Sequence, residues 1–147
     1  MSRKAIIIDI DGTLADVTHR LPALQARDWQ TCFETCDRDV PYQNMMWFVS
    51  LLSVAYSSRI LLCTGRPESY RIKTTMWLDR HEIPYDRLYM RRNDDLERPD
   101  YEVKRELLDQ MRADGYDPLI AIEDRYQCVA MWRAAGLTCL QCADGDY

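Results

Sequence analysis

Near its start the chain reads Ala5-Ile6-Ile7-Ile8-Asp9-Ile10-Asp11-Gly12-Thr13. The apolar run at residues 5–8 is typical of a strand buried in a parallel sheet. Two acids then follow at the carboxyl end of that strand, which is where ligands bind in open α/β sheets. Since the chain turns at Gly12, Asp9 and Asp11 can both point into one crevice. Asp-Gly is also common in ordinary turns, so the motif alone leaves a structural role open.

Apolar runs with the length of strands alternate with helical patterns along the chain. The predicted strands are Ala5–Ile10, Arg59–Cys63, Arg87–Met90, Leu119–Ile122 and Leu137–Gln141. The predicted helices are Asn44–Tyr56, Glu68–Arg80, Tyr101–Ala113 and Tyr126–Ala135. This alternation predicts an α/β fold with a doubly wound, Rossmann-like sheet of five parallel strands. Since 147 residues is the usual size of one domain, we expect a single domain over residues 1–147.

The predicted helices differ in how far they should be buried. Asn44–Tyr56 is apolar on most sides and is expected to lie inside the protein. Tyr101–Ala113 places its apolar residues on one face, and Tyr126–Ala135 is expected to end at Gly136. The segment 18–58 begins irregularly. We expect it to include a small cap-like or helical insertion, too short to be a separate domain.

The composition and charge of the chain limit the classes of function that the protein can have. Apolar residues make up 47% of the chain and charged residues 29%, which is ordinary for a globular protein. A net charge of −5 excludes a broad basic groove for nucleic acid, while a few local arginines could still bind one phosphate. The chain shows no signal-peptide pattern, and its longest apolar-rich stretch, Met45–Tyr56, is too short to cross a bilayer. We therefore expect a soluble, intracellular protein.

The chain contains six cysteines, which raises the question of a zinc site or disulfides. Cys139 and Cys142 have C-x-x-C spacing, and Cys32 and Cys36 are four apart. A zinc site would need a second well-spaced pair or histidines, and the chain has two histidines. Side chains three apart on a strand also point to opposite faces. Reduced, mostly buried thiols are therefore the favoured interpretation.

Three further regions carry residues of catalytic type. Thr64-Gly65-Arg66 follows a predicted strand and offers a hydroxyl and a backbone amide to a phosphate. Glu123-Asp124-Arg125 follows another strand, and adjacent buried acids are costly unless they serve a cation or a hydrogen-bond network. Lys104 precedes that strand on a predicted helix. Taken singly, each region also fits turn chemistry, helix capping or a surface charge.

Taken together, these regions resemble the haloacid dehalogenase (HAD) superfamily of phosphotransferases. The order is an Asp pair, a Thr, a Lys and an acid pair. Asp9 and Asp11 match the first motif, Thr64 the second, Lys104 the third, and Glu123 with Asp124 the fourth. The resemblance covers nearly the whole chain and implies a HAD-type fold with a minimal cap.

A closer resemblance is to the 3′-phosphatase domain of phage polynucleotide kinase-phosphatases. It extends to Arg20, to Asp100 four residues before Lys104, to Met131-Trp132-Arg133, and to the ending Gly145-Asp146-Tyr147. Three departures from this family stand out, and the third is the missing kinase half. Glu123 replaces an Asp of the family, and the segment after Arg20 is longer and matches poorly. No kinase P-loop motif occurs in the sequence. The likeness to phage enzymes implies a cytoplasmic location in an infected host and a part in nucleic acid repair.

The resemblance, with the chemistry of the side chains, implies a role for each site residue. Mg²⁺ would be held by Asp9, Asp124 and the backbone carbonyl of Asp11. Asp9 would attack phosphorus to form an aspartyl-phosphate, and Asp11 would act as general acid and then general base. The supporting residues are Thr64 and Lys104 for charge stabilisation, Asp100 and Glu123 for orientation, and Arg20, Gly65 and Arg66 for substrate binding.

The implied activity is removal of a 3′-phosphate from a DNA or RNA end, or from a nucleoside 3′-phosphate. A minimal cap would leave the site open to a polymer end. The alternative within the superfamily is a small-molecule phosphatase such as a nucleotidase. A phosphorelay receiver shares the Asp, Thr and Lys residue types, but its acceptor Asp lies on a middle strand and its Lys ends a later one. The order found here disfavours that interpretation.

Overall fold

A computed structural model describes residues 2–54 and 58–147, so the predicted helix end at Tyr56 lies outside the described residues. Five parallel strands form the main sheet, as the sequence predicted, and their order is β5-β4-β1-β6-β7. They are β1 (Arg3–Ile8), β4 (Arg59–Pro67), β5 (Arg87–Arg91), β6 (Tyr116–Arg125) and β7 (Thr138–Gly145). Most strands run a few residues beyond the predicted ends, because pairing with a neighbour extends them past their apolar cores.

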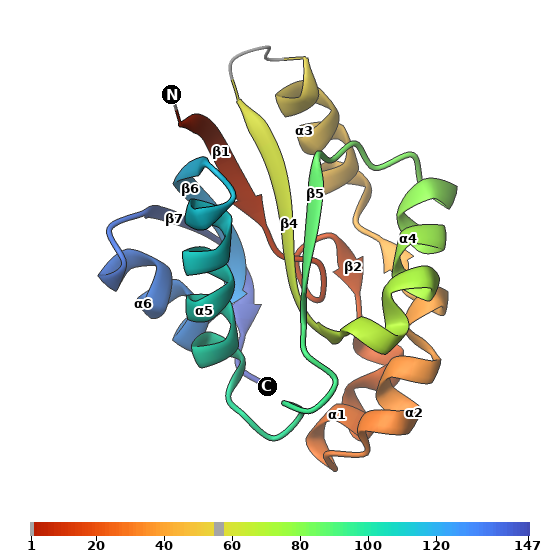
Figure 1. Ribbon diagram of the computed structural model, residues 1–147. Helices are drawn as coiled ribbons and strands as arrows, with labels where there is room; N and C mark the ends of the chain where they lie inside the picture. Colours follow the sequence, from red (N-terminus) through yellow and green to blue (C-terminus); the bar gives the residue numbers. More distant parts are fainter. Residues whose placement is uncertain (1, 55–57) are drawn as a thin grey trace.

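Helices cover both faces of the sheet (Figure 1). On one face lie α5 (Asp100–Ala113) and α6 (Tyr126–Ala134), and on the other lie α3 (Gln43–Ser53) and α4 (Arg71–Arg80). Successive strand residues enter opposite layers of the core, as the alternation of side chains requires. Ile7 packs with α5 and α6, whereas Ile8 packs with α3 and α4. The sheet is therefore buried on both faces, which explains its continuous apolar runs.

The two helices beside β6 match their predicted patterns. All four apolar residues on the inner face of α5 are buried: Val103, Leu107, Leu108 and Met111. Helix α6 ends beside Gly136, whose φ of +93° lies in the left-handed region that favours glycine. The predicted helix Glu68–Arg80 is a short 3-10 turn, η3 (Glu68–Tyr70), followed by α4.

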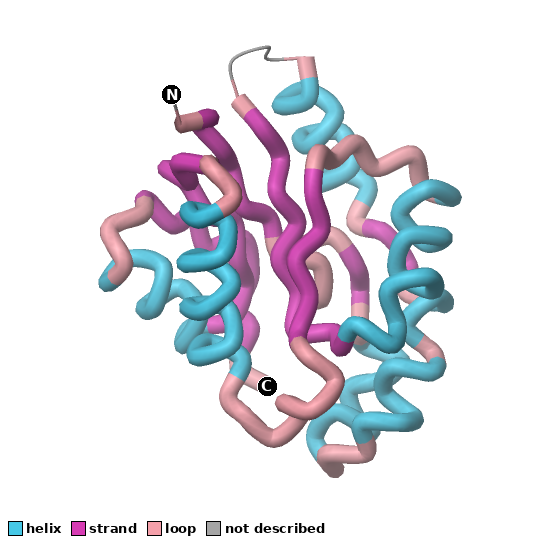
Figure 2. The backbone as a smooth tube through the Cα atoms, viewed as in Figure 1, coloured by secondary structure: helices cyan, strands magenta, loops and turns pink. Residues whose placement is uncertain are grey.

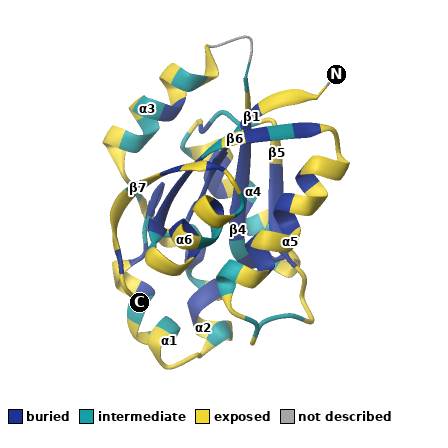
Figure 3. Ribbon diagram, turned by 90° about the vertical axis from the view of Figure 1, so that its left-hand side faces the viewer, coloured by how far each residue is buried: buried dark blue, intermediate teal, exposed yellow. Residues whose placement is uncertain are grey.

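The prediction that the helix Asn44–Tyr56 is buried was wrong. In α3 only Val49 is fully buried, while Trp47 is 66% exposed and Leu51 is 48% exposed. Figure 3 shows α3 mostly in the colour of exposed residues beside the buried strands. A helix that lies on a sheet buries only the stripe facing it. Trp77 and Leu78 of α4 already fill the neighbouring part of that face, so the outer side of α3 has nothing to pack against.

The segment between β1 and α3 is an insertion of short elements. They are β2 (Ala15–Asp16), η1 (Thr18–Arg20), α1 (Leu21–Gln25), α2 (Trp29–Glu34), η2 (Cys36–Arg38) and β3 (Val40–Pro41). Strands β2 and β3 pair antiparallel, with Ala15 opposite Pro41 and Asp16 opposite Val40. Figure 2 shows this excursion on one side of the main sheet. The pairing closes the insertion at its base and brings residue 39 back beside residue 20.

Two further expectations concern the cysteines and membranes. All six cysteines are free thiols, and five of them are buried, as predicted. Cys139 is buried and Cys142 is exposed, which matches their placement three apart on β7.

Among the helices that the structure describes, none combines the length and apolar character needed to cross a membrane.

Candidate active site

The four predicted motif regions meet at the carboxyl ends of the central strands. Asp9 follows β1, Thr64 lies near the end of β4, and Glu123 with Asp124 lies near the end of β6. Strand β1 pairs with both β4 and β6, so these residues become neighbours although up to 115 positions separate them in the chain. All four side chains are buried.

Lys104 is the buried cation at the centre of this cluster. Its Nζ lies 2.8 Å from Asp9 Oδ1, 2.8 Å from Glu123 Oε2 and 3.1 Å from Asp100 Oδ2. Burial lowers the pKa of Lys104, but the charges of Asp100, Asp9 and Glu123 outweigh it and raise that pKa well above its ordinary value. Asp100 lies one turn before Lys104 on α5, as predicted from the spacing. The lysine is therefore charged and fixed against Asp9.

Asp9 stands in a strongly acidic environment. Ligand oxygens of Asp9, Glu123 and Asp124 lie within 4.8 Å of one another. Burial, followed by the charge of Glu123, raises the pKa of Asp9 well above its ordinary value, although Lys104 opposes this. Thr13, which the sequence analysis did not single out, donates from Oγ1 to Asp9 Oδ2 at 3.2 Å. Such an excess of buried negative charge favours a cation beside Asp9.

The oxygens around Asp9 fit a hard divalent cation such as Mg²⁺. The hydroxyl of Tyr147 donates to Asp124 Oδ2 at 2.7 Å and to the carbonyl oxygen of Asp11 at 3.3 Å. These are two of the predicted metal ligands, and the shared donor shows that they converge on one point. Glu123 differs from these predicted ligands in its hydrogen bonds. One of its carboxylate oxygens already accepts a hydrogen bond from Lys104, and the other accepts one from the backbone nitrogen of Asp124. Glu123 thus holds its neighbours in place.

Asp11 lies in the opposite electrical environment, between two arginines. Its Oδ1 accepts from Arg20 Nη2 and from Arg66 Nη2, each at 2.6 Å. Burial raises the pKa of Asp11, but the charges of Arg20 and Arg66 outweigh it and hold that pKa far below its ordinary value. In this structure both guanidinium groups contact Asp11. Their predicted role as substrate ligands stays a prediction.

A second carboxylate, Asp39, completes this arginine cluster, and sequence reasoning missed it. Asp39 Oδ2 accepts from Arg20 Nη2 at 2.6 Å and from Arg66 Nη2 at 3.0 Å, and its side chain is fully buried. The indole nitrogen of Trp77 donates to its backbone carbonyl at 2.8 Å. No motif marks Asp39, because only the β2–β3 pairing brings it to the site.

Thr64 and Gly65 shape the opposite rim of the site. Thr64 Oγ1 accepts from the backbone nitrogen of Arg66 at 3.2 Å. A Cβ at residue 65 would overlap the carboxylate of Asp100, so glycine allows this close approach. Arg91, also missed from the sequence, donates to the carbonyl of Gly65 at 2.9 Å and to Asp100 Oδ1 at 3.2 Å. Arg91 therefore ties the end of β4 to the start of α5.

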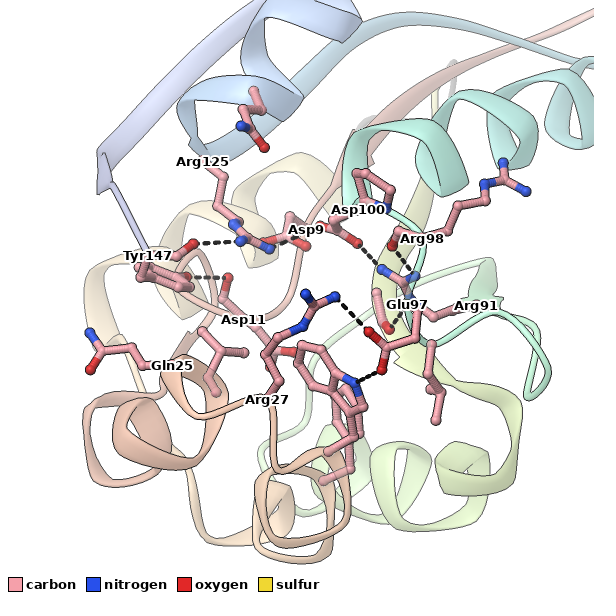
Figure 4. Close-up of a pocket in the computed structure, with 17 residues that line it drawn as sticks. Asp9, Asp11, Gln25, Arg27, Arg91, Glu97, Arg98, Asp100, Arg125 and Tyr147 are labelled. Carbon is pink, nitrogen blue, oxygen red and sulfur yellow. Dashed lines mark hydrogen bonds and ion pairs between the residues drawn. The ribbon is translucent and has the colours of Figure 1, made fainter.

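A pocket of about 260 Å³ opens onto these acids (Figure 4). Asp9, Asp11 and Asp100 line it, together with Arg125 and Tyr147. Residues of the insertion and of the loop before α5 also line it. Glu97 of that loop accepts from Arg27 Nη2 at 2.6 Å and from the indole nitrogen of Trp29 at 2.8 Å. The cap-like insertion and the loop are thus joined beside the pocket.

Solved structures show what this fold and site are similar to. A HAD family enzyme from Bacteroides thetaiotaomicron matches with a TM-score of 0.59 and 12% identity, covering 98% of this chain and 96% of that chain. At such low identity the likeness is one of fold. The parallel sheet and its covering helices are therefore arranged as in that enzyme.

Two further comparisons show the family to which the chain belongs. The family model of the polynucleotide kinase PNKP phosphatase domain matches residues 3–147. Structures of the Pnkp1/Rnl/Hen1 complex and of the Pnkp1/Rnl/Hen1 RNA repair complex match at 31% identity, with TM-scores of 0.84 and 0.85. Each match covers 99% of this chain and 48% or 44% of the other, so the chain spans less than half of those relatives. The chain belongs to the PNKP phosphatase domain family.

Proposed function

We propose that the protein is a Mg²⁺-dependent polynucleotide 3′-phosphatase. It would remove the 3′-phosphate from DNA or RNA ends, or from nucleoside 3′-phosphates, through an aspartyl-phosphate on Asp9. The observation that carries the proposal is the buried Asp9–Lys104–Asp124 cluster at the end of an open pocket. Membership of the PNKP phosphatase family supports the choice of substrate.

Asp9 and Asp11 have separate roles in the proposed reaction. A carboxylate oxygen of Asp9 forms a bond to phosphorus while the bond from phosphorus to the sugar oxygen breaks. Asp11 would give a proton to that leaving oxygen once the phosphate draws Arg20 and Arg66 away from it, because the two arginines otherwise keep Asp11 deprotonated. In the second step Asp11 would take a proton from the water that hydrolyses the acyl phosphate. Mg²⁺ held by Asp9, Asp124 and the Asp11 carbonyl would neutralise charge on the phosphate oxygens. Asp9 returns to its starting state with release of inorganic phosphate.

The surrounding residues keep these two carboxylates in place. Lys104 lies 2.8 Å from Asp9 and, with the hydroxyl of Thr64, would stabilise charge on the transferring phosphate. Arg20 and Arg66 bind Asp11 from two sides. This arrangement fixes the direction of the Asp11 carboxylate and favours a positioning role for both arginines, besides any contact with substrate. Asp100 and Glu123 orient Lys104.

The shape of the site favours the end of a polynucleotide chain as the substrate over a small metabolite that the protein would enclose. The insertion that borders the pocket contains two helices of five and six residues, α1 and α2, and its other elements are short strands and 3-10 turns. Such elements cannot enclose a substrate fully. The net charge of −5 also favours contact with only a few nucleotides. A small-molecule phosphatase, such as a nucleotidase, is the alternative that the test below separates.

The test compares matched oligonucleotides that carry either a 3′- or a 5′-phosphate, with a nucleoside 5′-monophosphate and a sugar phosphate alongside. We expect rapid release of phosphate from the 3′-phosphate and at least about tenfold slower release from the others. Equal rates on both ends, or faster hydrolysis of the sugar phosphate, would contradict the polynucleotide assignment.

The metal requirement is tested on the same oligonucleotide. Exhaustive treatment with EDTA should abolish activity, and Mg²⁺ should restore it. Mg²⁺ should also raise the melting temperature of the wild type, because ligands that bind only the folded state stabilise it. The Asp124→Asn variant should lose most of this thermal shift. Full activity in the EDTA-treated protein would refute the metal-dependent mechanism.

A further inference from the structure

The pocket has an apolar wall as well as its acids. Leu24, Trp29 and Phe33 from the insertion line it, together with Leu96 and Pro99 from the loop before α5. A phosphate and a metal ion require only the polar part. The apolar wall is therefore placed to receive the part of the substrate that follows the phosphate, which in a nucleotide is the sugar and the base.

Trp29 is the residue of this wall whose orientation is best defined. Its indole nitrogen donates to Glu97 Oε1 at 2.8 Å. Its ring lies near that of Phe33, one helical turn later, with centroids 6.3 Å apart and planes inclined by 21°. Phe33 is buried, whereas Trp29 remains half-buried at the pocket. Trp29 thus presents a large, oriented aromatic surface to the pocket.

A side chain that can move covers one face of this indole. The guanidinium carbon of Arg27 lies 5.7 Å from the centre of the Trp29 ring. Figure 4 shows Arg27 extending into the pocket and paired with Glu97. The side chains of Arg27 and Glu97 are 61% and 73% exposed, and exposed ion pairs contribute little stability. Arg27 can therefore leave the ring at small cost, and the uncovered face can take another flat group.

We propose that Trp29 is a specificity-determining residue, whose indole stacks on the nucleobase of the phosphorylated terminal nucleotide in the place that the Arg27 guanidinium now holds. The inference rests on the proposed function and names how the substrate is recognised. Stacking on an aromatic side chain tolerates every base, since each base has a π face. Recognition should therefore depend on the presence of a base and little on its identity.

The experiment uses two oligonucleotides that differ only in their 3′-phosphorylated terminal nucleotide, which either carries its base or is abasic. We expect the wild type to have a kcat/KM about tenfold higher on the end with the base. Trp29→Ala should remove this difference by slowing only the reaction on the base-containing end. Trp29→Phe should keep most of it. Trp47→Ala is the matched control, because Trp47 is 66% exposed on α3 and does not line the pocket.

Several outcomes would overturn the inference while leaving the proposed function intact. They are equal wild-type rates on the two ends, a preference that survives in Trp29→Ala, or a fall in that variant of the same size on both ends. A wild type that hydrolyses only small phosphomonoesters would refute the proposed function itself, and the inference with it.

Discussion

Asp9 and Asp11 lie two residues apart on one short turn, yet their surroundings are opposite. Asp9 lies among Glu123, Asp124 and one lysine. Burial and the charges of the two acids raise its pKa, although the lysine opposes them. Asp11 lies between two arginines, which hold its pKa low. The difference comes from topology. Residues from α5 and β6 surround Asp9, whereas the insertion and the end of β4 supply the partners of Asp11. Two identical side chains thus acquire two different environments from two parts of the chain.

The largest expected effect comes from removing the nucleophile. Asp9→Asn should lower kcat by more than about 10³-fold, because an amide cannot form the covalent intermediate. The fold should persist, since the substitution also relieves repulsion with Glu123 and Asp124. Phosphate release and thermal unfolding of the same sample measure both effects. Wild-type turnover in this variant would exclude the covalent mechanism. Asp11→Asn should also be severely impaired, through loss of proton transfer.

Lys104→Met tests the Asp9 side of the comparison. The lysine is the cation that Asp9, Asp100 and Glu123 share in the buried cluster. Leaving those carboxylates without it should lower the free energy of unfolding by about 3–5 kcal/mol, besides abolishing activity. Urea denaturation measures the loss. Lys73→Met, at a partly exposed lysine, is the control and should change stability by less than about 1 kcal/mol. Similar unfolding midpoints for the two variants would contradict the central role of Lys104.

Asp39→Asn tests the Asp11 side and should have the smallest effect of the three. The amide keeps the shape of the side chain but loses the charge that aligns Arg20 and Arg66. We expect kcat to fall about ten- to a hundredfold with little change in KM, as for the loss of a positioning residue. Asp37→Asn is a matched control two positions away. If Asp39→Asn were as active as Asp37→Asn, the arginine cluster would have no part in positioning Asp11.

The sequence predicted the sheet, and the motif residues lie together at its carboxyl end, for physical reasons. Buried parallel strands have continuous apolar runs, and their carboxyl ends bring residues 9, 64 and 123 together whatever the loop lengths. The burial of α3 could not be predicted, because composition does not tell how much of a sheet face another helix already covers. Asp39 and Arg91 were missed since each acts through contacts with residues distant in the chain. Their surroundings carry no local pattern.

The β2–β3 pairing separates the residues proposed for the chemistry from the residues that form the pocket wall. Arg20 and Asp39 lie just inside the paired residues, so two short strands fix the part of the insertion that serves the chemistry. The residues between them, including Trp29, contribute to the pocket wall and not to the reacting groups. If the protein has the proposed activity, we therefore expect substitutions or length changes in residues 21–35 to alter which chain ends it accepts and to leave hydrolysis itself unchanged. Substrate preference could then evolve, or be engineered, without changes to the proposed catalytic residues.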